Sequence, residues 1–159
     1  MRVGIGYDIH RLVNKRPLIL GGVKIPYHKG LMGHSDADVL VHAIIDALLG
    51  AIGDGDIGHH FPSSKSAYRG ISSLALLRRV GNRVEEYGFV IANIDTTVIT
   101  EEPNLHPFKT AMAQTIARTL ESPENIVNIK AHTNEKLDAV GRGEAMAAQA
   151  VALLRRKRT

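Results

Sequence analysis

Alternation of apolar and polar residues predicts a β-strand at the start of the chain. In the stretch Met1–His10, apolar positions alternate with others, and Asp8 and His10 stand two apart near its end. Side chains two apart in a strand point to the same face, so a carboxylate and an imidazole are expected side by side. Taken alone, the stretch also fits an exposed strand end with two unrelated polar residues.

Hydrophobic period and turn residues predict the remaining elements. Helices are expected at 39–49, 71–87 and 108–120, and strands at 89–100 and 126–131. Two short strands around a Gly-Gly turn are expected at 17–26, glycine-rich loops at 29–35 and 50–58, and a connection at 59–69. A last helix is expected from Glu144 to about Arg155, opened by Gly141-Arg142-Gly143.

This order of elements predicts an α+β fold for a single domain that spans residues 1–159. We expect one mixed β-sheet of four-stranded type, with helices on one face and a small β-hairpin beside it. If the chain leaves the other face of the sheet bare, a partner subunit must cover it, and oligomerisation follows.

The composition limits which side chains can bind a metal and which cellular compartment is expected. The chain has no cysteine, which excludes disulfides and leaves His, Asp and Glu as metal ligands. No signal-peptide pattern and no apolar run of membrane-spanning length are visible, so a cytoplasmic protein without membrane association is expected.

The net charge of +4 is concentrated at the end of the chain. Arg155, Arg156, Lys157 and Arg158 supply four positive charges, which leaves the rest of the chain neutral. A basic end to the last helix would complement its dipole, so we interpret the tail as a solvated helix end and expect no nucleic-acid partner. A functional polyanion-binding tail is the alternative.

Asp8, His10 and His42 form a possible three-ligand metal set, with His42 in the helix predicted at 39–49. Two imidazoles and one carboxylate suit Zn²⁺ with a fourth position left open. The alternative for His42 is a partly buried helix histidine among apolar neighbours.

The segment His34-Ser35-Asp36-Ala37-Asp38 leads into the same helix. Its histidine, hydroxyl and backbone N–H groups lie where a helix N-terminus attracts phosphate. Asp36 or Asp38 would also cap the helix, and the sequence leaves open that either is a metal ligand.

A second polar cluster, His132-Thr133-Asn134-Glu135-Lys136, directly follows a predicted strand. Open sheets place ligands at strand ends. Thr133 can donate to a phosphate oxygen and Glu135 can bind a hard cation such as Mg²⁺. A simple polar turn is the alternative.

Seven separate motifs in sequence order resemble those of the 2-C-methyl-D-erythritol 2,4-cyclodiphosphate synthase family, over the whole chain. Together with His42 they are Gly6-x-Asp8-x-His10, His34-Ser35-Asp36-x-Asp38, Asp46-Ala47-Leu48-Leu49-Gly50, Gly55-Asp56-Ile57-Gly58, Phe61-Pro62, Thr133-x-Glu135-Lys136-Leu137 and Gly141-Arg142-Gly143-Glu144.

The resemblance implies a homotrimeric lyase of the non-mevalonate isoprenoid pathway, with active sites between subunits. Its substrate would be 4-diphosphocytidyl-2-C-methyl-D-erythritol 2-phosphate, whose 2-phosphate attacks the β-phosphorus, closes a cyclic diphosphate and expels CMP. Because the attacking phosphate is already anionic, such chemistry needs cations to neutralise and align the groups rather than a dedicated general base.

The resemblance also assigns residue roles. Asp8, His10 and His42 would bind Zn²⁺ or another divalent cation, and Glu135 would contact a second ion, Mg²⁺ or Mn²⁺, that bridges the diphosphate. His34 and Thr133 would stabilise the transition state. The implied substrate contacts are Asp8, Ile9, His10, His34, Ser35, Asp56, Ile57, Gly58, Phe61, Thr100, Pro103, Leu105, His106, Ala131, His132, Thr133, Asn134, Glu135, Ala139 and Arg142.

These contacts divide among subsites. Residues 56–58 and Phe61 match the ribose and methylerythritol site, and residues 100–106 with Ala131 and His132 match the cytosine pocket. Arg142 matches a cavity on the trimer axis, where Ala139 replaces the usual aromatic residue. Two other functions share the same ligands: a Zn-dependent phosphohydrolase and a non-catalytic metal- or nucleotide-binding trimer.

Overall fold

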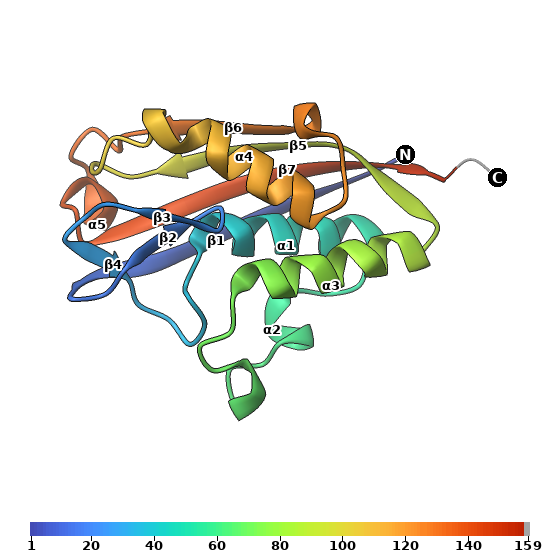
Figure 1. Ribbon diagram of the computed structural model, residues 1–159, viewed down its shortest axis with the longest axis horizontal. Coiled ribbons are helices and arrows are strands. Elements are labelled where there is room, and N and C mark those ends of the chain that lie inside the picture. The colour runs from blue at the N-terminus through green and yellow to red at the C-terminus, as the bar shows by residue number, and fades with distance from the viewer. Residues whose placement is uncertain (158–159) are drawn as a thin grey trace.

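Five strands form one mixed sheet in the computed structural model, which describes residues 1–157 (Figure 1). The strands lie in the order β4-β1-β7-β5-β6, in which β5 and β6 run parallel and the other neighbours antiparallel. Their bounds are Arg2–Asn14 for β1, Lys29–Leu31 for β4, Phe89–Ile99 for β5, Val127–His132 for β6 and Ala145–Arg156 for β7. The strands β2 (Leu18–Leu20) and β3 (Val23–Ile25) form a separate hairpin.

The α+β class and the hairpin are therefore confirmed, but the four-stranded count is wrong. The short edge strand β4 lies in the stretch expected as a glycine-rich loop, and β7 lies where a helix was expected. Three residues of β4 pair with the end of β1, a non-local contact that local sequence does not reveal.

The helices α1 (Val39–Ile52), α3 (Ser73–Glu86) and α4 (Lys109–Thr119) lie within three residues of the predicted bounds and cover one face of the sheet (Figure 1). Two further helices, α2 (Ile57–His60) and α5 (Asp138–Gly141), are one turn long and were not predicted. Short 3₁₀ turns occupy Ser66–Tyr68, His106–Phe108 and Glu124–Ile126. None of the helices in residues 1–157 combines the length and apolarity that crossing a membrane requires.

The last predicted helix is wrong, because this segment is the strand β7 at the centre of the sheet. Its Ala, Met, Leu and Arg residues have high helix propensity, which misled the prediction. From Ala148 onward the buried residues nevertheless alternate, at Ala148, Ala150, Ala152 and Leu154. Pairing with β1 on one side and β5 on the other outweighs the local preference.

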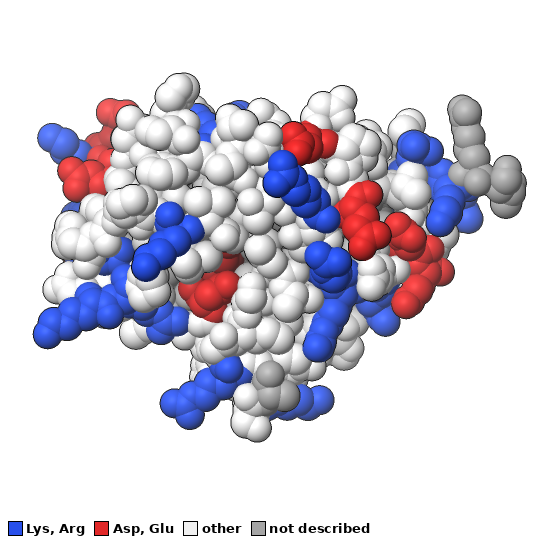
Figure 2. Space-filling model, in the orientation of Figure 1, with Lys and Arg blue, Asp and Glu red and all other residues white. Residues whose placement is uncertain are grey.

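The interpretation of the basic tail as a helix end is therefore also wrong. Arg155 and Arg156 are the last residues of β7, and Arg158 lies outside the described residues. The guanidinium groups of Arg156 and Arg2 lie 5.5 and 5.6 Å from the centre of the Phe89 ring, within cation–π range. On the face seen in Figure 2, basic and acidic side chains are interspersed.

Two glycines of β1 allow α1 to lie directly on the sheet. A Cβ at Gly6 would lie 1.9 Å from the Ala43 carbonyl oxygen of α1, and a Cβ at Gly4 would lie 2.0 Å from that of Ala47. Since no side chain fits there, backbone meets backbone. Asp8 and His10 continue the same face of β1, so the glycines bring these residues close to α1.

Asp38 fixes the start of α1. Its carboxylate caps the helix by accepting from the Val41 N–H (3.1 Å), as predicted, and also accepts from the N–H groups of Gly21 (3.0 Å) and Gly22 (2.7 Å) in the hairpin turn. Complete burial raises the pKa of Asp38 to about 6, although the three N–H donors oppose the shift. One buried side chain thus ties the hairpin to the first turn of α1.

We expect Gly6→Ala to lower the free energy of unfolding by about 2–3 kcal/mol, because α1 must move away from β1. Gly50→Ala is the matched control, since a Cβ there would meet only the Ile5 carbonyl oxygen at 3.9 Å. In the helix interior that change should be neutral or stabilise by up to about 1 kcal/mol. Urea denaturation measures both values, and equal stability of the two variants would contradict the close approach.

Candidate active site

The three predicted metal ligands meet between β1 and α1: Asp8 and His10 come from the strand, and His42 comes from the helix. The Asp8 Oδ2 atom lies 2.9 Å from both His10 Nε2 and His42 Nδ1, and these two nitrogens are 3.2 Å apart. No other group of three His, Asp or Glu side chains in residues 1–157 offers ligand atoms so close together. The three residues singled out by sequence therefore form one cluster.

Hydrogen bonds to the outer nitrogens orient both imidazoles. His10 Nδ1 donates to the Met32 carbonyl oxygen (2.8 Å), which leaves the lone pair of Nε2 toward Asp8. His42 Nε2 contacts Ser73 Oγ at 2.8 Å and Ser35 Oγ at 3.2 Å, so its Nδ1 faces the cluster. In each ring, one nitrogen thus faces the cluster while the other nitrogen has its own hydrogen-bond partner, as is usual for metal-binding histidines.

The electrostatics of the cluster favour a cation. Burial alone would raise the pKa of Asp8, but hydrogen bonds and charge from His10 and His42 hold it well below its usual range. Burial opposes protonation of His10, yet the bond and charge of Asp8 raise the pKa of this imidazole. The three ligand atoms lie within 3.2 Å of one another, and a divalent metal fits this donor set when it replaces the imidazole hydrogens.

A cavity of about 370 Å³ opens beside the cluster. Its walls include eight of the predicted site residues: Asp8, His10, His34, Ser35, His42, Ile57, Gly58 and Phe61. The predicted site residue Asp56 is not in this lining; it directly precedes Ile57 and caps α2 by accepting from the His59 N–H (2.8 Å). The Ile57 N–H donates to Asp46 on α1 (2.8 Å), which holds α2 against the helix that carries His42.

Sequence reasoning missed two residues that shape this cavity. Arg16 donates through one nitrogen to the carbonyl oxygens of Gly33 (3.1 Å) and Ser35 (2.8 Å) and so holds the loop around His34. Ser73 contacts both His42 and Asp36, which excludes Asp36 from the ligand cluster. Neither residue stands in a recognisable motif, because both act through contacts between distant segments.

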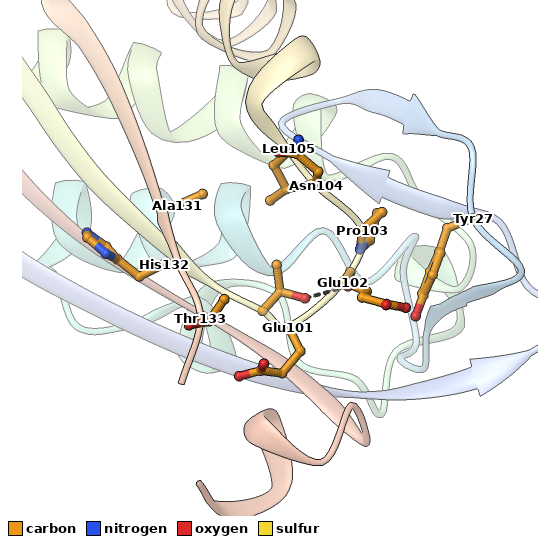
Figure 3. Close-up of a pocket in the computed structure, with 10 residues that line it drawn as sticks. Tyr27, Glu101, Glu102, Pro103, Asn104, Leu105, Ala131, His132 and Thr133 are labelled. Atoms are coloured by element: carbon orange, nitrogen blue, oxygen red, sulfur yellow. Dashed lines mark hydrogen bonds between the residues drawn. The ribbon is translucent and has the colours of Figure 1, made fainter. Parts of the chain in front are cut away.

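A second cavity, of about 520 Å³, lies at the far edge of the sheet (Figure 3). It is lined by Tyr27, Thr100, Glu101, Glu102, Pro103, Asn104, Leu105, Ala131, His132 and Thr133. Of the predicted cytosine-pocket residues, only His106 is not in its lining; the His106 N–H instead donates to Asn104 Oδ1 (3.0 Å). Burial and the nearby Glu102 raise the pKa of the Tyr27 hydroxyl, which faces Glu102 in Figure 3.

Thr133 and Glu135 lie together at the end of β6. The Thr133 hydroxyl donates to Glu135 Oε1 (2.9 Å), and both side chains are exposed. The turn that carries them is held by Glu101, which accepts from the N–H groups of Asn134 (2.8 Å) and Lys136 (3.2 Å). A hydroxyl and a carboxylate are thereby presented side by side.

The remaining predicted residues lie elsewhere. Ile9, Asn134 and Ala139 line a cavity of about 540 Å³ on the face of the sheet that the helices leave bare. Arg142 lines a different cavity and forms an ion pair with Glu144 (3.0 Å). Asn134, Ala139 and Arg142 therefore do not meet Asp8, His10 and His42 within one chain, whereas the Ile9 N–H donates to Asp8 Oδ1 (2.9 Å).

The cavity beside Asp8, His10 and His42 and the cavity in Figure 3 lie three strand spacings apart across the sheet. Asp8 of β1 pairs with Ala148 of β7, Ala148 with Val98 of β5, and Val98 with Ala131 of β6. Three strand spacings correspond to about 14 Å, and the two cavities share no lining residue. One chain thus carries two separate cavities.

An α+β fold with a carboxylate–imidazole cluster beside a helix start defines a candidate metal-dependent enzyme that binds phosphate. The chain belongs to the YgbB family, whose family model matches residues 1–155. A relative from Desulfosudis oleivorans, named 2-C-methyl-D-erythritol 2,4-cyclodiphosphate synthase, is 58% identical over 154 residues, which are 97% of this chain and 92% of the relative.

Solved structures show the same fold. The bifunctional IspDF from Campylobacter jejuni matches with a TM-score of 0.95 and 42% identity; the match covers 98% of this chain but only 42% of that longer chain. IspF from Plasmodium falciparum, solved as a CDP complex, matches with a TM-score of 0.86 and 33% identity over 99% of this chain and 97% of the other. The family resemblance that the motifs indicated is confirmed.

We expect His42→Ala to abolish tight zinc binding, because two ligands hold the ion far less well than three. The wild-type chain should bind about one Zn²⁺ per chain after dialysis, measured by atomic emission. His59→Ala is the control, since His59 is exposed on α2 and outside the cluster. Undiminished zinc in the His42 variant would exclude this residue as a ligand.

Proposed function

We propose that this chain converts 4-diphosphocytidyl-2-C-methyl-D-erythritol 2-phosphate to 2-C-methyl-D-erythritol 2,4-cyclodiphosphate and CMP. It is a lyase-type enzyme of isoprenoid biosynthesis that forms a cyclodiphosphate. The observation that carries the proposal is the cluster of Asp8, His10 and His42 in one cavity with His34 and Ser35. Family membership and whole-length relatives that carry the synthase name support it.

Metal ions would be held at two places. Asp8, His10 and His42 suit Zn²⁺ or a similar divalent ion, and Glu135 offers a carboxylate to Mg²⁺ or Mn²⁺. When bound, such ions neutralise phosphate charge and so lower the repulsion between an anionic nucleophile and an anionic diphosphate.

The protein's own groups then orient the phosphates. The Ser35 hydroxyl and the His34 imidazole line the cavity at the metal-ligand cluster, and the Thr133 hydroxyl is exposed beside Glu135. Each can donate to a phosphate oxygen and hold the 2-phosphate in line with the β-phosphorus. No side chain needs to remove a proton from the attacking phosphate.

The cavity in Figure 3 suits the cytidine part of the substrate. Its lining contains Ala131, Pro103 and Leu105, whose recognition groups are backbone atoms, and it holds Thr133 at its rim. A solved relative has CDP bound, which supports a cytidine-linked ligand for this chain. Asp56, Ile57, Gly58 and Phe61 would contact the sugar part at the other half-site.

We infer a homotrimer that combines half-sites from neighbouring chains. The face of the sheet opposite the helices carries Val3, Ile5, Tyr7 and Ile9, which are 67%, 74%, 53% and 44% exposed. Such an apolar stripe favours burial against another copy. A cyclic arrangement would bring the Thr133 edge of one chain to the metal-ligand cluster of the next, and Ala139 and Arg142 would then lie near the axis.

Incubation with the diphosphocytidyl substrate, Zn²⁺ and Mg²⁺ should release CMP and a cyclic diphosphate in equal amounts, which ³¹P NMR distinguishes from linear phosphates. Linear products would identify a phosphohydrolase instead. No turnover by the zinc-loaded protein would favour a binding protein.

Ile5→Glu should reduce the assembly to single chains, because it places a carboxylate in the middle of the proposed apolar interface. Light scattering should show a mass about one third of the wild-type value, and CMP release should be lost with it. Arg78→Glu, which changes a charge on the exposed side of α3, should leave the mass unchanged. A wild-type chain that is monomeric and fully active would refute the composite site.

A further inference from the structure

A buried hydrogen-bond chain leads away from the metal-ligand cluster on the far side of His42. His42 Nε2 contacts Ser73 Oγ at 2.8 Å, and Ser73 Oγ in turn bonds Asp36 Oδ1. The Ser73 N–H also bonds Asp36 Oδ2 (2.9 Å). Ser73 is completely buried at the first turn of α3, so one residue joins α3 to the helix that carries His42.

The donors and acceptors of this chain can be assigned. The Asp36 carboxylate accepts from the Ser73 hydroxyl, the Ser73 N–H and the Asp38 N–H (3.2 Å). A serine hydroxyl has one hydrogen, and here it is committed to the carboxylate. The Ser73 oxygen can therefore only accept from His42, which requires the hydrogen of the ring to be on Nε2.

This assignment has two consequences at the cavity. His42 Nδ1 faces Asp8 Oδ2 at 2.9 Å, and when a cation is bound there this nitrogen supplies its lone pair to the ion while Ser73 holds Nε2–H. Ser35 Oγ, 3.2 Å from the same Nε2–H and 3.1 Å from the Ala37 N–H, is also placed as an acceptor. The hydroxyl hydrogen of Ser35 is then available to a ligand in the cavity that Ser35 lines.

We propose that Ser73, held by Asp36, is a positioning residue that holds the His42 ring through Nε2–H, so that Nδ1 faces the bound metal, and that leaves the Ser35 hydroxyl hydrogen available to the bound phosphate. The inference rests on the proposed metal site. The proposal adds two residues, Ser73 and Asp36, that would touch neither the metal nor the substrate. Because Ser73 belongs to α3, the orientation of His42 would depend on the position of α3.

Long-range ¹H–¹⁵N NMR, with and without zinc, tests the hydrogen bond from His42 Nε2–H to Ser73 directly. The wild-type Nε2–H should exchange slowly with water, because Ser73 accepts this hydrogen in a buried position. Ser73→Ala should make the exchange fast. Asp36→Asn should do the same, because an amide N–H₂ facing Ser73 Oγ turns the serine hydroxyl into a donor that opposes Nε2–H.

Zinc affinity, measured by competition with a chelator, gives the second readout. Ser73→Ala and Asp36→Asn should each weaken zinc binding by about 10–100-fold, and Ser73→Thr, which keeps the hydroxyl, should restore most of it. Ser72→Ala is the matched control, because the neighbouring Ser72 side chain makes no capping bond to α3. Thermal unfolding of each sample separates an affinity change from a loss of folding.

An unchanged exchange rate of His42 Nε2–H together with a zinc affinity within twofold of wild type in Ser73→Ala would overturn the proposal. If that variant does not fold, the same two outcomes in Asp36→Asn decide. A wild-type chain that binds no zinc would instead refute the proposed metal site, and the exchange of Nε2–H measured without zinc would still confirm or overturn the role of Ser73.

Discussion

The close approach of α1 to β1 is the constraint on which the rest of the structure depends. Gly4 and Gly6 leave no side chain between the strand and the helix, so their backbones touch. Because Asp8 and His10 follow on the same strand face, the approach places them against His42 with ligand atoms about 3 Å apart. Asp38 keeps that register by capping α1 and holding the hairpin turn.

The strand order of the sheet keeps the two cavities apart. The cluster of Asp8, His10 and His42 lies between β1 and α1, the cavity in Figure 3 lies at β6, and two strands separate them. The proposed reaction would need groups from both cavities at one diphosphate and would therefore favour assembly, for which the exposed apolar side chains of β1 offer a surface. Burial of Val3 and Ile5 and completion of the active site would thus be the same event.

Local patterns predicted most elements, and they failed where a non-local contact outweighed a local preference. The three long helices and the strands β5 and β6 have strong periodicity and clear turn residues. The alanine-rich segment of β7 has helix propensity along its length but is held as a strand by pairing on both sides. The roles of Arg16 and Ser73 were not predicted for a similar reason, because their hydrogen-bond partners are distant in sequence.

The sequence by itself determined the chemistry: two imidazoles and a carboxylate at fixed spacing, a hydroxyl before a helix, and motifs that identify the family. Residue types, together with the repeat of apolar positions that marks strands and helices, are sufficient to predict these features. Only the tertiary structure decided which nitrogen of each histidine faces the cluster, that Asp36 supports Ser73 rather than a metal, and that the two cavities lie apart. These depend on distances between segments, which arise when the chain packs.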